Sequence, residues 1–220
     1  MKKPGMTNRK KQSTRGIAVF LGAALFCTSG VTVSAKGDSL EDVIQKTADY
    51  ETGIVTDPTV ASIGGEWTVI PLARGDASLP DDYFEKYRAN VEKYLKENDG
   101  ILSDHKYTEY SRVVLALKSI GADPTDIGGY DVQKPLENFD TVTTQGLNGA
   151  VFALLALNAD DPEQNKDGDL EQKYLAYILE QEKPDGGFSL DDNADQSDVD
   201  MTAMTLQCLE PYQDQEAVKE

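Results

Sequence analysis

The chain has very few of the residues that build the most common catalytic and metal sites. Its 220 residues contain two cysteines, Cys27 and Cys208, and one histidine, His105. Cys27 lies in an N-terminal segment, described below, that is expected to be cleaved off. The mature chain then keeps Cys208 alone and cannot form an internal disulfide. Cys208 is expected to be a small buried packing residue. One histidine and one cysteine cannot supply a usual zinc site, a Ser/His/Asp triad or a Cys/His pair, and no cofactor is predicted.

Positive charge and long apolar runs are also scarce. The chain has 21 Lys and Arg residues against 39 Asp and Glu residues, and its formal net charge is −18. So acidic a surface argues against nucleic acid as a partner, because phosphates require a basic footprint. It also disfavours adsorption to anionic membranes. Outside the N-terminal segment no apolar run reaches the ~18 residues of a membrane helix, so no stable membrane span is expected after cleavage.

Residues 1–35 have the pattern of a signal peptide. Six basic residues precede an apolar segment at 17–27, and Val33 and Ala35 stand at the −3 and −1 positions of a cleavage site. The alternatives are an uncleaved anchor, for which the apolar segment is too short, and a lipid on Cys27, which bulky rather than small residues precede. The sequence therefore predicts a protein that is secreted from a bacterium or held at its cell surface.

Small and apolar residues at helical spacing recur along the mature chain. Four equivalent positions, Ala73, Ala116, Ala156 and Cys208, lie 43, 40 and 52 residues apart. Intervals of this length, with two helices each, are typical of stacked or closed helical arrays. Inner helices rich in small residues are predicted near 66–75, 107–121, 145–158 and 198–210. Charged outer helices are predicted near 81–97 and 169–183, and a further helix begins after Ser39.

The most specific pattern lies at 181–209, QEKPDGGFSLDDNADQSDVDMTAMTLQCL. Two glycines end one helix, an aromatic residue and an acidic loop follow, and an Asp-capped helix comes next. This segment resembles the prenyltransferase/squalene-oxidase repeat, which builds the α/α toroids of terpenoid cyclases, protein prenyltransferases and vitamin B12 carriers of the transcobalamin type. Three upstream segments resemble secreted bacterial members of the same group: 64–74, 106–124 and 146–157.

The resemblance implies an all-α fold, an α/α toroid-like array of helical hairpins. At about 40–50 residues per repeat, the mature chain is too short for a ring of six hairpins, so a partial or truncated ring is expected. The expected organisation is a signal peptide at 1–35, an N-terminal helix and linker at 36–63, the repeat domain at 64–213 and a polar tail at 214–220.

Asp198 and Asp200 are the candidate catalytic residues. In the terpene cyclases of this group, an Asp-X-Asp-Asp-Thr-Ala stretch carries the acid that protonates an alkene, and that acid must be held protonated. By position Asp200 would be the acid and Asp198 its neighbour, but Met201 stands where the motif has its last Asp. The alternative, which is the more common use of Asp at such a position, is that Asp198 or Asp200 caps the helix that follows.

Aromatic and acidic residues near the starts of inner helices are the candidate ligand-binding residues. The set consists of Trp67, Glu66, Glu109, Tyr110 and Phe188. Glu66 and Glu109 each precede an aromatic residue at equivalent repeat positions, and with Asp200 they are predicted to form a shared rim at the mouth of the ring. The aromatic members, with Tyr107 and Phe152, could line a cavity and stack on a flat or polyene ligand, or could fill the helical core.

Two acidic loops, at 165–169 and 191–198, have oxygen ligands of the kind that Ca²⁺ prefers. The first has Tyr174 where an EF-hand would place its closing Glu, and the second lacks the sharp Gly turn. Solvated surface loops are the simpler interpretation, and no metal site is predicted.

The predicted function is that of a secreted or cell-surface repeat module that binds a ligand or partner rather than catalysing a reaction. Export, the missing zinc ligands, the incomplete Asp motif and the short ring favour it. The expected partner is a small hydrophobic or cobalamin-like ligand or a cell-surface molecule. The alternative is a terpenoid-cyclase- or prenyltransferase-like enzyme that uses Asp200 as its acid.

Overall fold

The computed structural model describes residues 37–161 and 165–219, so the predicted signal peptide at 1–35 lies outside the described residues. The chain divides into two compact units, 1–38 and 39–220. Every described helix belongs to the second unit, and everything below concerns that unit.

Within the described ranges, all named elements of secondary structure are helices. The one extended pairing found there is an isolated bridge between Ile127 and Tyr130, in the irregular connection that follows the second inner helix. The predicted all-α class is therefore confirmed. None of the helices in these ranges is long and apolar enough to cross a membrane.

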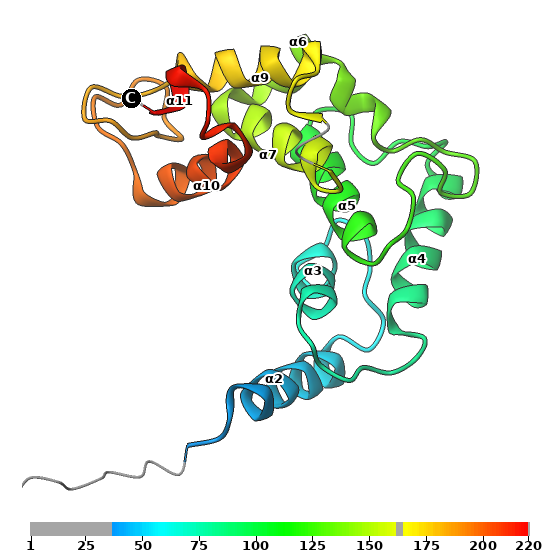
Figure 1. Ribbon diagram of the computed structural model, residues 1–220. Coiled ribbons are helices and arrows are strands. Elements are labelled where there is room, and N and C mark those ends of the chain that lie inside the picture. The colour runs from blue at the N-terminus through cyan, green and yellow to red at the C-terminus, as the bar shows by residue number, and fades with distance from the viewer. Residues whose placement is uncertain (1–36, 162–164, 220) are drawn as a thin grey trace, which may run out of the picture. The chain divides into compact units, whose positions relative to one another are not determined.

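Four helices form the inner row: α3 (Glu66–Arg74), α5 (Tyr107–Ser119), α7 (Gly146–Asn158) and α10 (Val199–Leu209). Each contacts the next in this order, as Figure 1 shows. Their bounds agree with the predicted inner helices to within two residues. α7 also packs closely against the chain just before it: a Cβ atom at Gly149 would clash with the carbonyl oxygen of Val142, so glycine is required there.

Three further helices accompany the inner row: α2 (Leu40–Ile54), α4 (Tyr83–Glu97) and α9 (Asp169–Leu179). On α4 the buried residues recur at a spacing of four, at Tyr83, Tyr87, Val91 and Leu95, which gives the helix one apolar face. The predicted helix after Ser39 is α2. It begins with a capping box in which the side chains of Ser39 and Asp42 each accept the other's backbone N–H.

Shorter helical turns complete the described chain: η1 (Lys134–Glu137), α6 (Phe139–Val142), η2 (Thr143–Gln145), η3 (Glu210–Tyr212) and α11 (Glu216–Lys219). The last of these, α11, lies in the segment 214–220, which the sequence predicts to be a polar tail. Its Val218 is partly buried and packs against the main core, which explains why the segment folds back rather than extending into solvent.

The main hydrophobic core joins residues of α4, α5, α7, α9 and α10. Two buried tyrosine hydroxyls tie the connections to this core. The Tyr174 hydroxyl donates to the carbonyl oxygen of Leu136 at 2.8 Å, and the Asn158 amide donates to the Tyr212 hydroxyl at 2.8 Å. Cys208 is a buried free thiol whose pKa is raised by burial, as expected for a packing residue.

Candidate functional site

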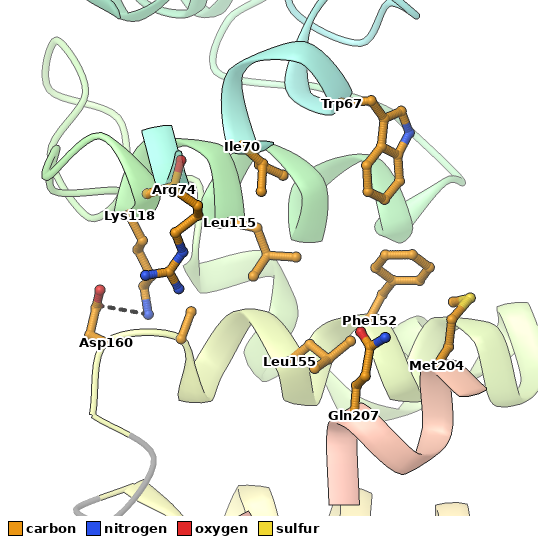
Figure 2. Close-up of a pocket in the computed structure, with 12 residues that line it drawn as sticks. Trp67, Ile70, Arg74, Leu115, Lys118, Phe152, Leu155, Asp160, Met204 and Gln207 are labelled. Atoms are coloured by element: carbon orange, nitrogen blue, oxygen red, sulfur yellow. Dashed lines mark ion pairs between the residues drawn. The ribbon is translucent and has the colours of Figure 1, made fainter. Parts of the chain in front are cut away.

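A groove of about 470 Å³ crosses the inner row and receives side chains from all four of its helices. Its walls are mainly apolar and consist of Trp67, Ile70, Leu115, Phe152, Leu155, Ala159 and Met204. Figure 2 shows Arg74, Lys118 and Asp160 together on one side of this space. We call it the apolar groove. Its volume lies in the range of about 300–1,000 Å³ that is usual for ligand pockets.

An aromatic pair stands at the far side of the apolar groove from Arg74 (Figure 2). The rings of Trp67 and Phe152 meet edge to face, with centroids 6.2 Å apart and planes at 67°. Trp67 is the only tryptophan of the chain, and 49% of its surface is exposed. A large aromatic side chain left half exposed beside other apolar side chains marks a surface suited to binding.

A second hollow of about 300 Å³ begins at the same aromatic pair. Besides Trp67 and Phe152 it is lined by polar side chains, those of Lys106, Thr108, Glu109, Arg112 and Asn148. We call it the polar pocket. Because the apolar groove and the polar pocket share two lining residues, they are adjacent parts of one surface.

The charged groups of the polar pocket have no direct partners within the described chain. The side chains of Lys106, Glu109, Arg112 and Asn148 form no hydrogen bond or ion pair there, and the Nε atom of Arg112 is buried without an acceptor. Buried donors in native proteins are nearly always satisfied. The Nε atom is too buried for a ligand to reach, but the other two guanidinium nitrogens of Arg112 are unpaired and are not buried, so a ligand that enters the pocket can bind to them.

The ammonium group of Lys118, by contrast, has a partner for each of its N–H donors. Its ammonium group donates to the carbonyl oxygens of Ala156 and Leu157 at 3.0 and 3.4 Å and pairs with the Asp160 carboxylate at 3.0 Å. These contacts use its three N–H donors and place a cation at the C-terminal end of α7, where the helix dipole favours one. Arg74, on the same side of the groove, has no ion pair within the described residues.

The structure does not form the predicted rim of Glu66, Glu109 and Asp200, and that prediction is wrong for two of its members. Glu66 is completely buried, and Asp200 is exposed at the start of α10 and lines neither the apolar groove nor the polar pocket. Of the three, only Glu109 lines a pocket. Neighbouring positions on a helix point about 100° apart, so Trp67 faces the groove while Glu66 beside it faces inward.

Glu66 has an internal role instead. One of its carboxylate oxygens accepts the Ala61 N–H at 2.9 Å and the Tyr87 hydroxyl at 3.1 Å, and the other has no partner. Burial raises the pKa of Glu66, and these hydrogen bonds and the charge of Arg112 oppose the rise. The residue connects the loop before α3 with α4.

Of the two candidate acids, Asp198 is the helix cap. Its carboxylate accepts the N–H of Met201 at 2.7 Å and the N–H of Leu190 at 2.8 Å, and these bonds lower its pKa. A carboxyl group that is held ionised is the opposite of what a proton donor requires. Asp200 is exposed and its side chain forms no hydrogen bond within the described residues.

Tyr110 and Phe188 belong to the core rather than to a ligand site. Each is only 4% exposed. The Tyr110 hydroxyl accepts the Leu102 N–H at 3.0 Å, and the Phe188 N–H donates to the Thr202 hydroxyl at 2.9 Å. Of the five predicted ligand-binding residues, Trp67 and Glu109 therefore lie at a pocket, and Glu66, Tyr110 and Phe188 do not.

The acidic loops hold no cluster of metal-binding side chains in the parts that the structure describes: no group of three His, Cys, Asp or Glu residues is close enough together to hold an ion. In the second loop the Asp191 carboxylate accepts the N–H of Asn193 at 2.9 Å, which is a local turn contact.

Comparison with known proteins adds no relative. The chain matches no protein-family model, and no curated protein or solved structure matches it significantly. Its function is therefore inferred from the apolar groove, the polar pocket and the aromatic pair.

Proposed function

We propose that this protein is an exported helical-repeat module that binds a ligand or partner in the apolar groove and does not catalyse a reaction. The observation that carries this proposal is the apolar surface that four successive inner helices leave open. Residues from all four helices, among them Trp67, Phe152 and Met204, line this surface. Contiguous open apolar surface of this kind is characteristic of interaction sites.

The proposal includes the repeat type and the location. The row of inner helices with outer partners supports an α/α toroid-like repeat of the prenyltransferase/squalene-oxidase kind, arranged as a partial ring. The turn and cap of the segment 181–209 support it too, with Gly186 at a φ of 84° and Asp198 at the start of α10. Secretion or surface attachment rests on the sequence of residues 1–35.

The competing enzyme hypothesis has little support. A terpenoid-cyclase-like protein would need a protonated acid directed into an apolar cavity. Asp200 lies at the exposed start of α10, and the pKa of Asp198 is lowered by two backbone N–H groups. Neither residue lines the apolar groove. Binding without chemistry is the function that agrees with these positions.

A thermal-shift screen of the mature protein tests the proposal. The panel contains cobalamins, polyprenyl alcohols and cell-wall glycans, because the expected partners are small hydrophobic molecules, cobalamin-like molecules or surface molecules. We expect a member with an apolar body to raise the unfolding temperature and to change the fluorescence of Trp67, the only tryptophan. Turnover of squalene or of a prenyl diphosphate that is lost in Asp200→Asn would contradict it and establish the enzyme.

A further inference from the structure

We infer that the ligand is an amphipathic molecule with one acidic group, whose apolar body lies in the apolar groove and whose acidic group binds in the polar pocket beside Arg112 and Lys106. This inference rests on the proposed function and specifies the chemistry of the ligand. It follows from three features of the surface: the continuity of the two hollows, the unpaired donors of one of them, and the charge of the chain around them.

The continuity comes from Trp67 and Phe152. Both line the apolar groove of about 470 Å³ and the polar pocket of about 300 Å³. One molecule can therefore contact the apolar walls contributed by Leu115, Leu155 and Met204 and reach past the aromatic pair into the polar pocket. Ligand sites commonly combine an apolar lining with a few polar groups that fix orientation.

The unpaired donors define the acidic group. Arg112 forms no hydrogen bond within the described residues although its Nε atom is buried, and Lys106 and Asn148 leave their side-chain donors free as well. A guanidinium group matches the two oxygens of a carboxylate in a bidentate arrangement, and such charge-assisted bonds are the strongest that side chains form. A neutral ligand could not form this bidentate ion pair.

Two carboxyl groups are near enough to compete for Arg112, and neither pairs with it. Glu109 lines the polar pocket but forms no ion pair there. Glu66 interacts with Arg112 electrostatically, while its oxygens face Ala61 and Tyr87. The two cations of the pocket therefore outnumber its one lining acid, Glu109.

The charge of the whole chain makes this local excess of cations distinctive. With a net charge of −18, the protein as a whole attracts cations and repels anions. A preference for an acidic ligand must therefore come from the pocket itself. The same net charge disfavours a second copy of the chain as the occupant of the groove.

Four probes separate the contributions of the head group and the apolar body. Decanoate carries both, decanol has only the body, acetate has only the head, and decyltrimethylammonium carries the opposite charge. Each is titrated into the mature protein below its aggregation concentration, with Trp67 fluorescence and calorimetry as readouts. We expect decanoate to bind about tenfold or more tightly than decanol or decyltrimethylammonium, which corresponds to one strong charge-assisted contact, and acetate to bind too weakly to measure.

Two variants identify the residues that hold the acidic group. Lys106→Gln and Arg112→Gln should each weaken decanoate binding several-fold and leave decanol binding unchanged. Lys106 is exposed, so its variant tests the inference even if Arg112→Gln alters folding through the loss of the charge facing Glu66. Lys93→Gln on α4 is the matched control, because it removes a cation that lines neither hollow and should have no effect.

The outcomes distinguish the two proposals. If decanoate, decanol and decyltrimethylammonium bind equally and all report through Trp67, the groove is a ligand site but the acidic ligand is wrong. Decanoate binding that survives both Gln variants overturns the inference in the same way. If no probe with an apolar body binds, the proposed function fails together with the inference.

Discussion

Trp67 and Phe152 meet edge to face across the inner row, with ring centroids 6.2 Å apart, although 85 residues separate them in the chain. Trp67 lies near the start of α3 and Phe152 lies in α7, and α5 contacts both of these helices. The pair thus forms the border between the apolar groove and the polar pocket. It also places the only tryptophan of the chain where a bound molecule would touch it.

Removing the partner ring tests this contact. Phe152→Ala should lose about 0.5–1.5 kcal/mol from the edge-to-face contact, in addition to the loss from the apolar area that this half-buried ring covers. Trp67 should become more exposed to water, so its fluorescence emission should shift to longer wavelength. Leu206→Ala on α10 is the control, because Leu206 is exposed and lies outside both hollows. An emission spectrum that is unchanged in Phe152→Ala would show that the two rings do not meet.

Asp198 is expected to stabilise the fold as a helix cap. Asp198→Ala should lower the unfolding temperature by about 2–4 °C, because two backbone N–H groups lose their acceptor. Asp198→Asn and Asp198→Ser should recover part of the loss. Asp200→Ala is the matched control two residues away and should melt like the parent. A larger loss in Asp200→Ala than in Asp198→Ala would reverse the assignment of the cap.

The same residue predicts a pH dependence. The pKa of Asp198 is lower in the folded state than in the unfolded chain, where it is about 3.9. Its charge therefore stabilises the protein above that value, and this stability is lost as the pH falls through the folded-state pKa. The difference in stability between the parent and Asp198→Asn should shrink as denaturation is followed from neutral pH to below about pH 4. A difference that does not change with pH would contradict this.

Glu66 predicts the opposite dependence. Burial raises its pKa in the folded state, so the folded state binds its proton more strongly than the unfolded state does. Its contribution is fully favourable below the unfolded value of about 4.3 and is lost as the pH rises through the folded-state pKa. Glu66→Gln should therefore gain stability relative to the parent as the pH rises from about 4 to 8 in urea denaturation. A constant difference would show that burial does not shift this carboxyl group.

Lys118 and Asp160 should respond unequally to substitution. Lys118→Met leaves the carbonyl oxygens at the end of α7 without their donor and should cost about 1–3 kcal/mol. Asp160→Asn removes only an exposed ion-pair partner and should cost well under about 1 kcal/mol. Denaturant unfolding of the two variants measures both values. Equal losses would mean that the ion pair, rather than the helix end, is what Lys118 stabilises.

The sequence predicted the helices well because their signals are local. Small residues at helical spacing indicate α7, and the spacing of four from Tyr83 to Leu95 indicates α4. The sequence did not predict which side of the helix a residue near its start would face. Glu66 and Trp67 were both predicted to bind a ligand, yet Glu66 is buried, where it accepts hydrogen bonds from Ala61 and Tyr87, and Trp67 is half exposed.

The site itself was only partly predictable. From the sequence alone either Asp198 or Asp200 could cap the helix, and the hydrogen bond from the N–H of Met201 to the Asp198 carboxylate identifies Asp198 as the cap. Arg74 and Met204 of the apolar groove and Arg112 of the polar pocket were missed, although inner helices carry a second stripe beside their core stripe. On α7 that stripe runs through Asn148, Phe152, Leu155 and Ala159, at spacings of three and four. A search for two stripes on one helix could have found these residues.

The most direct test of ligand binding in the groove compares two substitutions on α10. Met204 lines the apolar groove, whereas Leu206 is 60% exposed and does not. Met204→Glu and Leu206→Glu add the same charge to the same helix, and binding of a ligand with an apolar body is measured for each by titration of Trp67 fluorescence. We expect Met204→Glu to weaken binding at least about tenfold, since it places a charge in the site, and Leu206→Glu to bind like the parent. Equal affinities for the two variants would show that the groove is not where the ligand binds.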